Sequence, residues 1–338
     1  MLSVGSEASS TEVPRDEEWF GQMTYRDARG MYRVAKDVVE VTNYCDISAS
    51  RLLVAGFGTQ GTVYKTGEFA VKVIQNTRCL RHIERFRQEA QILARLAHPN
   101  VCRLRGIGSA VLPSLVLDWV ETDLSRVTPR SDRVAVELAS ALAHLHSGNA
   151  IGEGLVVIHR DVKPANVGIT ASGQVKLLDF GLAAVVVAAP KKGATWQLTG
   201  FVGSPTYMAP ENARGARYGT PVDVYSFSLT LWELFASRGP PFKNFSLDDL
   251  DRYVVRRGQR PKLPLDWDPR LAAVVEASWA PTPTARPTAS ELVKVLVRLE
   301  ENPGSMDPFH APSSSSSSGS WRFSIKKKRR PPLNNNNR

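Results

Sequence analysis

Residues 51–74, RLLVAGFGTQGTVYKTGEFAVKVI, constrain the fold of this chain more than any other stretch. Short apolar runs alternate in it with glycines, and such runs are typical of β-strands joined by tight turns. We therefore expect three consecutive strands here, followed by a helix over residues 81–96 that ends before Pro99. Two further strands are predicted around residues 103–107 and 114–119.

Beyond Glu121 the pattern becomes mainly helical. Residues 134–147, VAVELASALAHLHS, have the periodicity of an amphipathic helix. Residues 222–237, VDVYSFSLTLWELFAS, are apolar on most sides and predict a buried helix. A strand-rich first part and a helix-rich second part, divided near residue 120, predict an α+β fold with two lobes.

The two ends of the chain differ in composition from the part between them. The first dozen residues are rich in Ser, Glu and Thr and are expected to be disordered, whereas residues 19–44 predict one or two amphipathic helices. A serine run, the basic cluster KKKRRPP and an asparagine run lie near the other end, and none of these can bury a core. We therefore assign residues 1–45 to a flank, 46–302 to the folded domain and 303–338 to a disordered tail.

The net charge of +10 suggests nucleic-acid binding only until the charges are located along the chain. Residues 303–338 hold seven Lys or Arg and one Asp, which accounts for +6 of the total. The rest of the chain is not unusually basic. We therefore expect no stable nucleic-acid binding by the globular part.

Neither secretion nor a membrane span is predicted. The first residues, MLSVGSEASSTEV, lack the basic start and apolar core of a signal peptide, and no apolar stretch approaches the roughly 20 residues that span a bilayer. The three cysteines, Cys45, Cys79 and Cys102, show no CxxC spacing and are expected to be reduced thiols. We therefore expect an intracellular protein of the cytoplasm, the nucleus or both.

Three glycines, Gly56, Gly58 and Gly61, stand between the first two predicted strands in the pattern GxGxxGxV, which ends at Val63. Because glycine has no side chain, backbone amides at these positions can approach phosphate oxygens closely. The same spacing at the start of a helix would indicate a dinucleotide-binding fold, whereas a position between strands favours a flap over nucleotide phosphates. A plain flexible hairpin stays an open alternative.

A lysine lies inside the third predicted strand, in the sequence AVKV. Burying Lys72 in such a strand is costly unless its ammonium group meets an anion. Glu89 on the following helix can supply the anion, because it has apolar neighbours and a better spacing than the competing Glu84. Taken singly, each of these residues could equally be a solvent-facing charge.

Two polar motifs, HRDVKPAN and LLDFG, stand about twenty residues apart in the second part of the chain. Asp161 can accept a proton from a hydroxyl, and Lys163 can neutralise a transferred phosphate. Asn166 and Asp179 can offer oxygen ligands to Mg²⁺. Phosphoryl transfer needs mainly positioning and neutralisation of charge, so the joint occurrence of both motifs downstream of the glycines and Lys72 indicates this chemistry.

With these motifs the chain resembles the eukaryotic protein kinase family over roughly residues 50–300. Further family motifs are APE at residues 209–211, Asp223 in DVYSF and Arg286 in ARPT, and the resemblance implies that Arg286 pairs with Glu211. It also implies a bilobal fold. A small strand-rich N-lobe with one regulatory helix would cover about 46–118, and a larger, mainly helical C-lobe about 119–302.

The resemblance also assigns residues to the nucleotide and the metal. Leu117 maps to the gatekeeper, which implies that the backbone of Asp118 and Val120 meets the adenine and that Asp123 meets the ribose. The implied catalytic residues are Asp161, Lys163, Asn166, Lys72 and Glu89; the nucleotide-binding residues are Gly56, Gly58, Gly61, Val63, Ala70, Lys72, Leu117, Asp118, Val120, Asp123 and Gly168; the metal ligands are Asn166 and Asp179.

Gly168 departs from the family, which usually has leucine as the floor beneath the adenine ring. Loss of one such side chain removes about 1 to 2 kcal/mol of apolar contact, roughly a tenfold effect on affinity if nothing refills the gap. We therefore predict a raised KM for ATP that Gly168→Leu lowers. Two other departures, Gln60 and Ser228, are not expected to touch the chemistry.

The resemblance is strongest to serine/threonine kinases of the tyrosine-kinase-like branch. Lys163, two residues after Asp161, follows the serine/threonine pattern, and the hydroxyl of Ser204 is expected to bridge these two residues. Arg160 occupies a position that usually holds a phosphorylated residue of the activation segment. We expect Thr199 to be that residue, with Thr195 as the second candidate and an exposed threonine without a role as the alternative.

An active kinase that uses ATP and Mg²⁺ on protein substrates is the leading interpretation. A pseudokinase or weakly active kinase that serves as a scaffold is the alternative, supported only by the altered adenine floor. A small-molecule phosphotransferase is disfavoured by the APE motif and Arg286. The basic cluster resembles a nuclear import signal, so an import receptor is a candidate partner and a solvated tail without function the alternative; the cluster is Lys326, Lys327, Lys328, Arg329 and Arg330.

Overall fold

The structure is a computed structural model that describes residues 24–26, 32–34, 53–58, 61–74, 79–108, 113–127, 132–188, 193–236 and 239–301. The chain forms two compact units, Met1–Cys79 with Leu104–Leu117 and Leu80–Arg103 with Asp118–Arg338. The first is rich in strands and the second in helices, so the predicted α+β class with two lobes is confirmed. The expectations for the basic cluster, the tail and Gln60 concern residues outside the described ranges.

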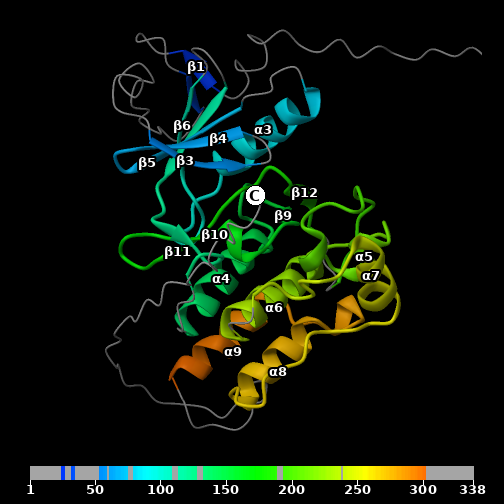
Figure 1. The fold of residues 1–338 in the computed structure, drawn as a ribbon. Coiled ribbons are helices and arrows are strands. Elements are labelled where there is room, and N and C mark those ends of the chain that lie inside the picture. The colour runs from blue at the N-terminus through cyan, green and yellow to red at the C-terminus, as the bar shows by residue number, and fades with distance from the viewer. Residues whose placement is uncertain are drawn as a thin grey trace, which may run out of the picture. The chain divides into compact units, whose positions relative to one another are not determined.

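The first unit is built on one seven-stranded sheet in the order β1-β2-β6-β7-β5-β4-β3 (Figure 1). The three strands predicted in residues 51–74 are present and pair antiparallel with their sequence neighbours. The strands are β1 (Thr24–Arg26), β2 (Tyr32–Val34), β3 (Leu53–Gly58), β4 (Gly61–Thr66), β5 (Phe69–Val73), β6 (Leu104–Gly108) and β7 (Ser114–Asp118).

The start of β4 requires a glycine. A Cβ atom on Gly61 would lie 1.9 Å from the carbonyl oxygen of Val73, so any other residue would push β4 away from β5. On this sheet Val71, Val73 and Val116 form a buried apolar cluster. Burial of these side chains stabilises the hairpin that carries the three glycines.

The helices predicted over residues 19–44 are wrong where the structure describes this stretch. β1 and β2 pair antiparallel, and Tyr32 of β2 lies opposite Ile107 of β6. Strands of three residues are too short to show a period of two in the sequence. Pairing with β6, a tertiary contact, decides their conformation instead.

The second unit is mainly helical, and α4 with α9 and α6 with α8 form its closest helix pairs (Figure 1). The buried character predicted for residues 222–237 is confirmed, because α6 is buried from Val222 to Leu234. No helix in the described part of the chain is long and apolar enough to cross a membrane. The helices are α3 (Leu80–Leu93), α4 (Asp132–Leu145), α5 (Pro210–Ala213), α6 (Pro221–Ala236), α7 (Leu247–Asp249), α8 (Pro269–Ser278) and α9 (Ala289–Glu301), with short helices η1 (Pro164–Asn166), η2 (Pro205–Tyr207), η3 (Leu250–Arg256) and η4 (Pro283–Ala285).

Helix α3 lies in the second unit, although the sequence predicts it within the strand-rich lobe. The segment after α3 explains this. The amide of Cys102 donates to the carbonyl of Leu177 at 2.9 Å, and the amide of Leu177 donates to the carbonyl of Asn100 at 2.8 Å. The side chain of Gln88 on α3 also donates to the carbonyl of Ala183. These bonds attach α3 and the segment that follows it to the helical unit.

Two small sheets of the second unit position the polar motifs. One has the strand order β11-β10-β8 and the other pairs β12 with β9, all antiparallel. HRDVKPAN follows β9 and leads into β10, whereas LLDFG lies at the end of β11 and before β12. The strands are β8 (Thr122–Asp123), β9 (Leu155–Ile158), β10 (Val167–Ile169), β11 (Val175–Leu177) and β12 (Ala184–Val187).

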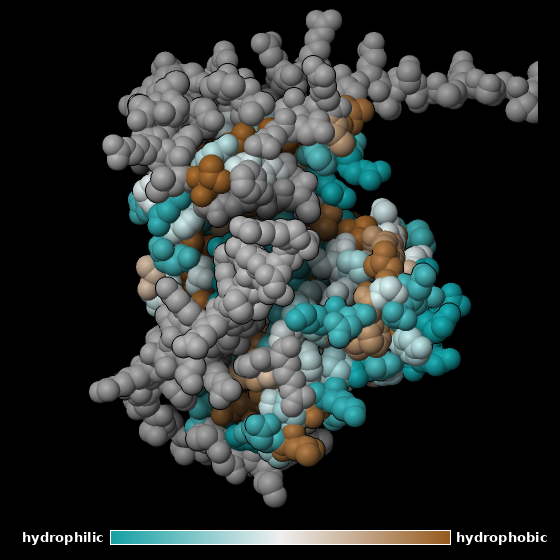
Figure 2. Space-filling model, viewed as in Figure 1, coloured by the Kyte–Doolittle hydropathy of each residue, from teal (hydrophilic) through white to brown (hydrophobic). Residues whose placement is uncertain are grey.

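Among the described residues of the helical unit, few large hydrophobic side chains are exposed. Figure 2 shows hydrophilic residues over much of the described part of this face, with hydrophobic residues gathered in a few places. Isolated apolar residues on a surface are common and carry no functional argument by themselves. Those within the described ranges of this unit are Leu80, Val185, Val187, Phe201, Leu247 and Leu265.

Candidate active site

A buried aspartate on α6 holds the backbone of HRDVKPAN. The carboxylate of Asp223 is fully buried and accepts the amide N–H groups of His159 and Arg160, each at 2.8 Å. It also contacts Nε2 of His146 at 2.9 Å. Burial by itself raises the pKa of Asp223, but the hydrogen bond and charge of His146, the charge of His159 and the Arg160 amide lower the pKa below its ordinary value. An ionised Asp223 therefore fixes the turn, in which Arg160 adopts a left-handed φ of 67°.

Two side chains of the motif, those of Lys163 and Asn166, contact the carboxylate of Asp161. Its Oδ2 atom accepts from Nζ of Lys163 at 2.8 Å and from Nδ2 of Asn166 at 2.9 Å. The same Nδ2 atom of the Asn166 side chain also donates to the backbone carbonyl of Asp161 at 2.9 Å. Pro164 starts the short helix η1 between these residues, and its ring favours the turn that folds Asn166 back. The structure therefore brings the predicted Asp161, Lys163 and Asn166 together.

Ser204 also contacts this cluster, partly as expected. Its hydroxyl accepts from Nζ of Lys163 at 2.7 Å. The contact with Asp161, however, is made by the backbone amide of Ser204, which donates to Oδ1 at 2.8 Å. The expectation that the hydroxyl bridges both residues is thus right for the lysine and wrong for the aspartate. Both oxygens of Asp161 are held, so its orientation is fixed.

The close approach of the Ser204 segment depends on a glycine. Gly203 has a φ of +107°, and a Cβ atom there would lie 2.2 Å from the carbonyl oxygen of Arg160. Only glycine adopts this backbone conformation readily and leaves room for the carbonyl. The residue before Ser204 therefore decides whether Ser204 can reach Asp161.

Asp179 lies next to the same motif. The amide of Leu178 donates to the carbonyl of Asn166 at 2.9 Å, and Nε2 of His159 lies 2.9 Å from the carbonyl of Leu178. Asp179 is half-buried and has a left-handed φ of 59°, which is uncommon outside glycine. The backbone thus ties the segment that carries Asp179 directly to Asn166.

The residues expected at the hinge and the ribose lie from the end of β7 to the end of β8. The amide of Asp118 donates to the carbonyl of Arg103 at 3.1 Å, and its carbonyl lies 3.8 Å from Sγ of Cys102. Burial raises the pKa of the Cys102 thiol to about 12, so this thiol stays protonated and inert. Asp123 accepts from the amide of Ser125 at 2.9 Å and pairs with Arg126 at 3.1 Å. The carboxylate assigned to the ribose thus also caps its own turn.

The structure changes the expectation for Gly168. A Cβ atom built on Gly168 would lie 2.8, 2.9 and 3.0 Å from three side-chain atoms of Val120. Distances this short exclude a side chain at residue 168 unless Val120 moves. Val120 therefore already occupies the surroundings of the Cβ position at residue 168, and the effect of Gly168 on ATP binding stays a prediction.

The remaining predicted residues belong to the strand-rich unit, except Glu89. Gly56 and Gly58 lie on β3, and Lys72 on β5 stands opposite Val63 of β4. Glu89 is buried on α3 of the other unit, so its pairing with Lys72 stays a prediction. Of the other assigned residues, Ala70 is buried opposite Lys65, and Leu117 lies half-buried opposite Leu104.

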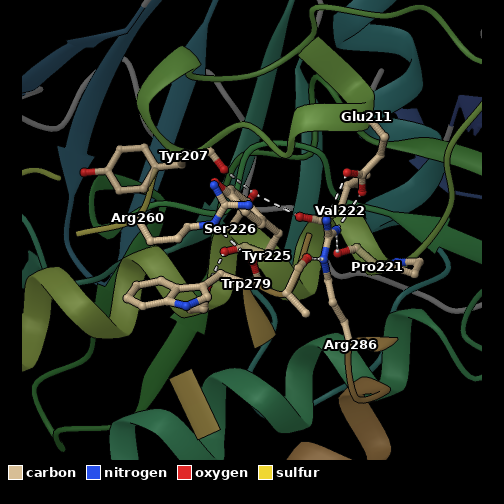
Figure 3. A network of polar contacts seen from close by, with 11 residues as sticks. Tyr207, Glu211, Pro221, Val222, Tyr225, Ser226, Arg260, Trp279 and Arg286 are labelled. Carbon is tan, nitrogen blue, oxygen red and sulfur yellow. Dashed lines mark hydrogen bonds and ion pairs between the residues drawn. The ribbon is translucent and has the colours of Figure 1, made fainter. Parts of the chain in front are cut away.

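The predicted pairing of Glu211 with Arg286 is confirmed (Figure 3). The two guanidinium nitrogens of Arg286 donate to the two carboxylate oxygens of Glu211 at 2.6 and 3.0 Å, a bidentate geometry. The Cζ atoms of Arg286 and Arg260 lie 5.0 and 4.9 Å from the centre of the Tyr225 ring, which is labelled in Figure 3. Ser226 beside it donates to the carbonyl of Tyr207 at 2.8 Å. This network joins the APE motif to α6 and to the segment before α9.

Sequence reasoning missed two residues that support the site. His146 follows α4 and binds Asp223, and Tyr218 lies before α6 and contacts Arg160 at 3.1 Å. A histidine just after an amphipathic helix and a tyrosine between two helices are unremarkable in sequence. Their partners lie 77 and 58 residues away along the chain, so no local spacing signals the contacts.

Comparison with known protein families identifies the family of this chain. Residues 51–297 match the protein kinase domain. The chain belongs to the protein kinase family. The matched range covers most of the chain and includes all the motifs described above, from the glycine hairpin to Arg286.

Curated relatives of this chain carry kinase names. Over 257 residues it is 32% identical to a probable LIM domain-containing serine/threonine-protein kinase of Dictyostelium discoideum, covering 71% of this chain and 37% of that protein. It is 30% identical over 258 residues to the dual specificity protein kinase shkD of the same organism, covering 73% and 34%. A serine/threonine-protein kinase of Arabidopsis thaliana is 29% identical over 263 residues, covering 73% and 43%. The chain thus spans less than half the length of each of these relatives.

Proposed function

We propose that this chain transfers the γ-phosphate of ATP to serine and threonine hydroxyls of protein substrates. The observation that carries the proposal is the orientation of Asp161, whose two carboxylate oxygens are held by Lys163, Asn166 and the Ser204 amide. Membership of the protein kinase family and the names of the relatives support it. The tyrosine-kinase-like branch is the one that the motifs favour.

In the proposed reaction Asp161 accepts a hydrogen bond from the substrate hydroxyl and takes its proton as the new O–P bond forms and the bond to ADP breaks. Lys163 lies 2.8 Å from Asp161 and 2.7 Å from the Ser204 hydroxyl. Its ammonium group can therefore neutralise charge on the transferring phosphoryl group while it keeps the Ser204 segment in register. The protein contributes positioning and charge rather than covalent chemistry.

Protein kinases generally use ATP with Mg²⁺, and the metal neutralises the phosphates. Asn166 and Asp179 would hold the metal. The side chain of Asn166 donates both of its hydrogen bonds to Asp161 from the amide nitrogen, which leaves the amide oxygen as the ligand atom. Because Mg²⁺ takes only one or two protein oxygens beside phosphate, this pair fits the ion.

Nucleotide binding is proposed for residues of both units. Among the described residues, no hydrogen bond occupies the Val120 backbone groups, which suits an adenine contact. Lys72 would bind phosphate and pair with Glu89. The remaining proposed contacts are Gly56, Gly58, Gly61, Val63, Ala70, Leu117, Asp118, Asp123 and Gly168.

Transfer of labelled phosphate to peptide libraries tests the proposal. Wild type and Asp161→Asn are compared on peptides with serine, threonine or tyrosine acceptors, and Asp251→Asn, an exposed aspartate, is the matched control. We expect transfer to serine and threonine that only Asp161→Asn abolishes. Transfer to tyrosine as well would broaden the specificity to that named for shkD. Nucleotide binding without any transfer would overturn the proposal in favour of a scaffold.

A further inference from the structure

The guanidinium group of Arg160 is bound by neutral groups. Its Nε atom donates to the carbonyl of Leu182 at 2.6 Å, and its terminal nitrogens donate to the carbonyl of Ala183 at 3.3 Å and to the hydroxyl of Tyr218 at 3.1 Å. These are the donors that would otherwise meet a phosphorylated residue of the activation segment, residues 179–211. Uncharged acceptors therefore already orient the arginine.

Tyr218 connects Arg160 to the activation segment. The side chain is 1% exposed, and its hydroxyl donates to the carbonyl of Thr199 at 2.7 Å while it accepts from Arg160. A phenol can donate and accept at once, so one buried hydroxyl satisfies both partners. The side chain of Thr199, in contrast, is exposed, and the backbone of this residue makes the contact.

The backbone beside Tyr218 reinforces this connection. Trp196 and Tyr218 exchange two amide-to-carbonyl hydrogen bonds of 2.8 and 3.1 Å, and Arg217 donates to the carbonyl of Thr195 at 2.8 Å. The close approach of these two segments requires glycine at residue 219, because a Cβ atom there would lie 2.2 Å from the carbonyl oxygen of Ala194. Hydrogen bonds that need no phosphate thus join Thr195, Trp196 and Thr199 to Arg217 and Tyr218.

We propose that Tyr218 is a positioning residue that holds the activation segment on Arg160 without phosphorylation. The inference rests on the proposed kinase function and concerns its regulation. Arg160 is fixed at its backbone by Asp223 and precedes Asp161, and Ser204 of the same activation segment holds both Asp161 and Lys163. Loss of the Tyr218 hydroxyl loosens the segment that Ser204 belongs to. The expected phosphate on Thr199 is then not required for activity.

The test compares Tyr218→Phe with Tyr225→Phe in the full chain after treatment with a protein phosphatase. Tyr225 is a matched control, because its hydroxyl is buried but has no hydrogen-bond partner among the described residues. Mass spectrometry verifies that Thr195 and Thr199 carry no phosphate. We expect phosphatase-treated wild type and Tyr225→Phe to keep full activity. Tyr218→Phe is expected to raise the KM for peptide and lower kcat/KM about tenfold, with the KM for ATP unchanged.

This pattern separates positioning from simple loss of folded protein. A smaller folded fraction lowers the apparent kcat but leaves both KM values unchanged. Two results would overturn the inference: loss of wild-type activity on phosphatase treatment, or Tyr218→Phe behaving like Tyr225→Phe. Neither result bears on Asp161-dependent transfer by the untreated protein, so the kinase proposal would survive.

Amide hydrogen exchange tests the inference even if no peptide is phosphorylated. Amides of residues 195–200 in the unphosphorylated chain are expected to exchange faster in Tyr218→Phe than in wild type or Tyr225→Phe. Amides of α6 serve as the internal control for global opening and are expected to be equal in all three. Equal exchange of residues 195–200 in the three proteins would overturn the inference.

Discussion

The side chain of Val120 occupies the space that a side chain on Gly168 would need. The valine lies before β8 and the glycine is in the middle of β10, and a Cβ atom on the glycine would come within 2.8 to 3.0 Å of three valine atoms. The two residues therefore share one volume on the helical unit. In sequence this position looks like a missing leucine, whereas in the structure Val120 already lies against the Cβ position of residue 168.

This relationship reverses the prediction for Gly168→Leu. The single substitution is expected to raise the KM for ATP, because leucine overlaps Val120 at a cost of about 1 to 3 kcal/mol. Val120→Ala combined with Gly168→Leu is expected to bring the KM back toward wild type. Steady-state kinetics of the two single variants and the double variant measure this coupling. A lower KM in Gly168→Leu alone would show that the floor is bare after all.

The bond between Arg286 and Glu211 predicts a large loss of stability. Both side chains are buried and bound at two points, so Arg286→Ala leaves a buried carboxylate without its partner. We expect the free energy of unfolding to fall by about 3 to 5 kcal/mol. Arg256→Ala breaks an exposed pair with Asp251 and is expected to cost less than about 1 kcal/mol. Urea denaturation compares the two, and equal losses would contradict the prediction.

His98 predicts a decline of stability in acid. Burial, then the neighbouring His144 and Lys176, lowers the pKa of His98 from its ordinary value of 6.5 to about 4. Between these two values the unfolded chain binds a proton that the folded chain does not. The stability provided by neutral His98 is therefore present above pH 6.5 and is lost as the pH falls toward 4.

Unfolding free energies at pH 6.5, 5.5 and 4.5 check this in wild type and His98→Phe. The variant is less stable at every pH, because His98 accepts from the amide of Asn100 at 3.1 Å and lies 3.3 Å from the Ser140 hydroxyl. The free energy of unfolding of His98→Phe is nevertheless expected to fall less between pH 6.5 and 4.5 than that of wild type. Groups other than His98 titrate in both proteins, so the difference isolates the histidine. Identical slopes would refute the assignment.

The sequence predicts the features that depend on neighbours along the chain. Asp161, Lys163 and Asn166 lie within six positions, and the proline among them favours the turn that brings them together. The strand triplet of residues 51–74 and the buried helix α6 follow from apolar patterns for the same reason.

Such local patterns do not predict contacts between segments that lie far apart in the sequence. Glu211 and Arg286 lie 75 residues apart and were expected to pair only because of a family resemblance. Tyr218 gave no signal, and Val120 was named only for its backbone, since the contacts of both side chains come from segments brought near by folding. The strands β1 and β2 were missed because pairing with β6, and not their own composition, determines them.

Phosphoryl transfer by Asp161→Asn, measured together with ATP affinity, tests the central claim most directly. The substitution preserves the size of the side chain but removes the carboxylate that receives the hydroxyl proton and accepts from Lys163 at 2.8 Å. We predict that the single-turnover rate of transfer to a serine peptide falls by about 10² to 10⁴, while the dissociation constant for ATP changes by less than about threefold. A variant that transfers phosphate at the wild-type rate would contradict the assignment of Asp161 and, with it, the proposed mechanism.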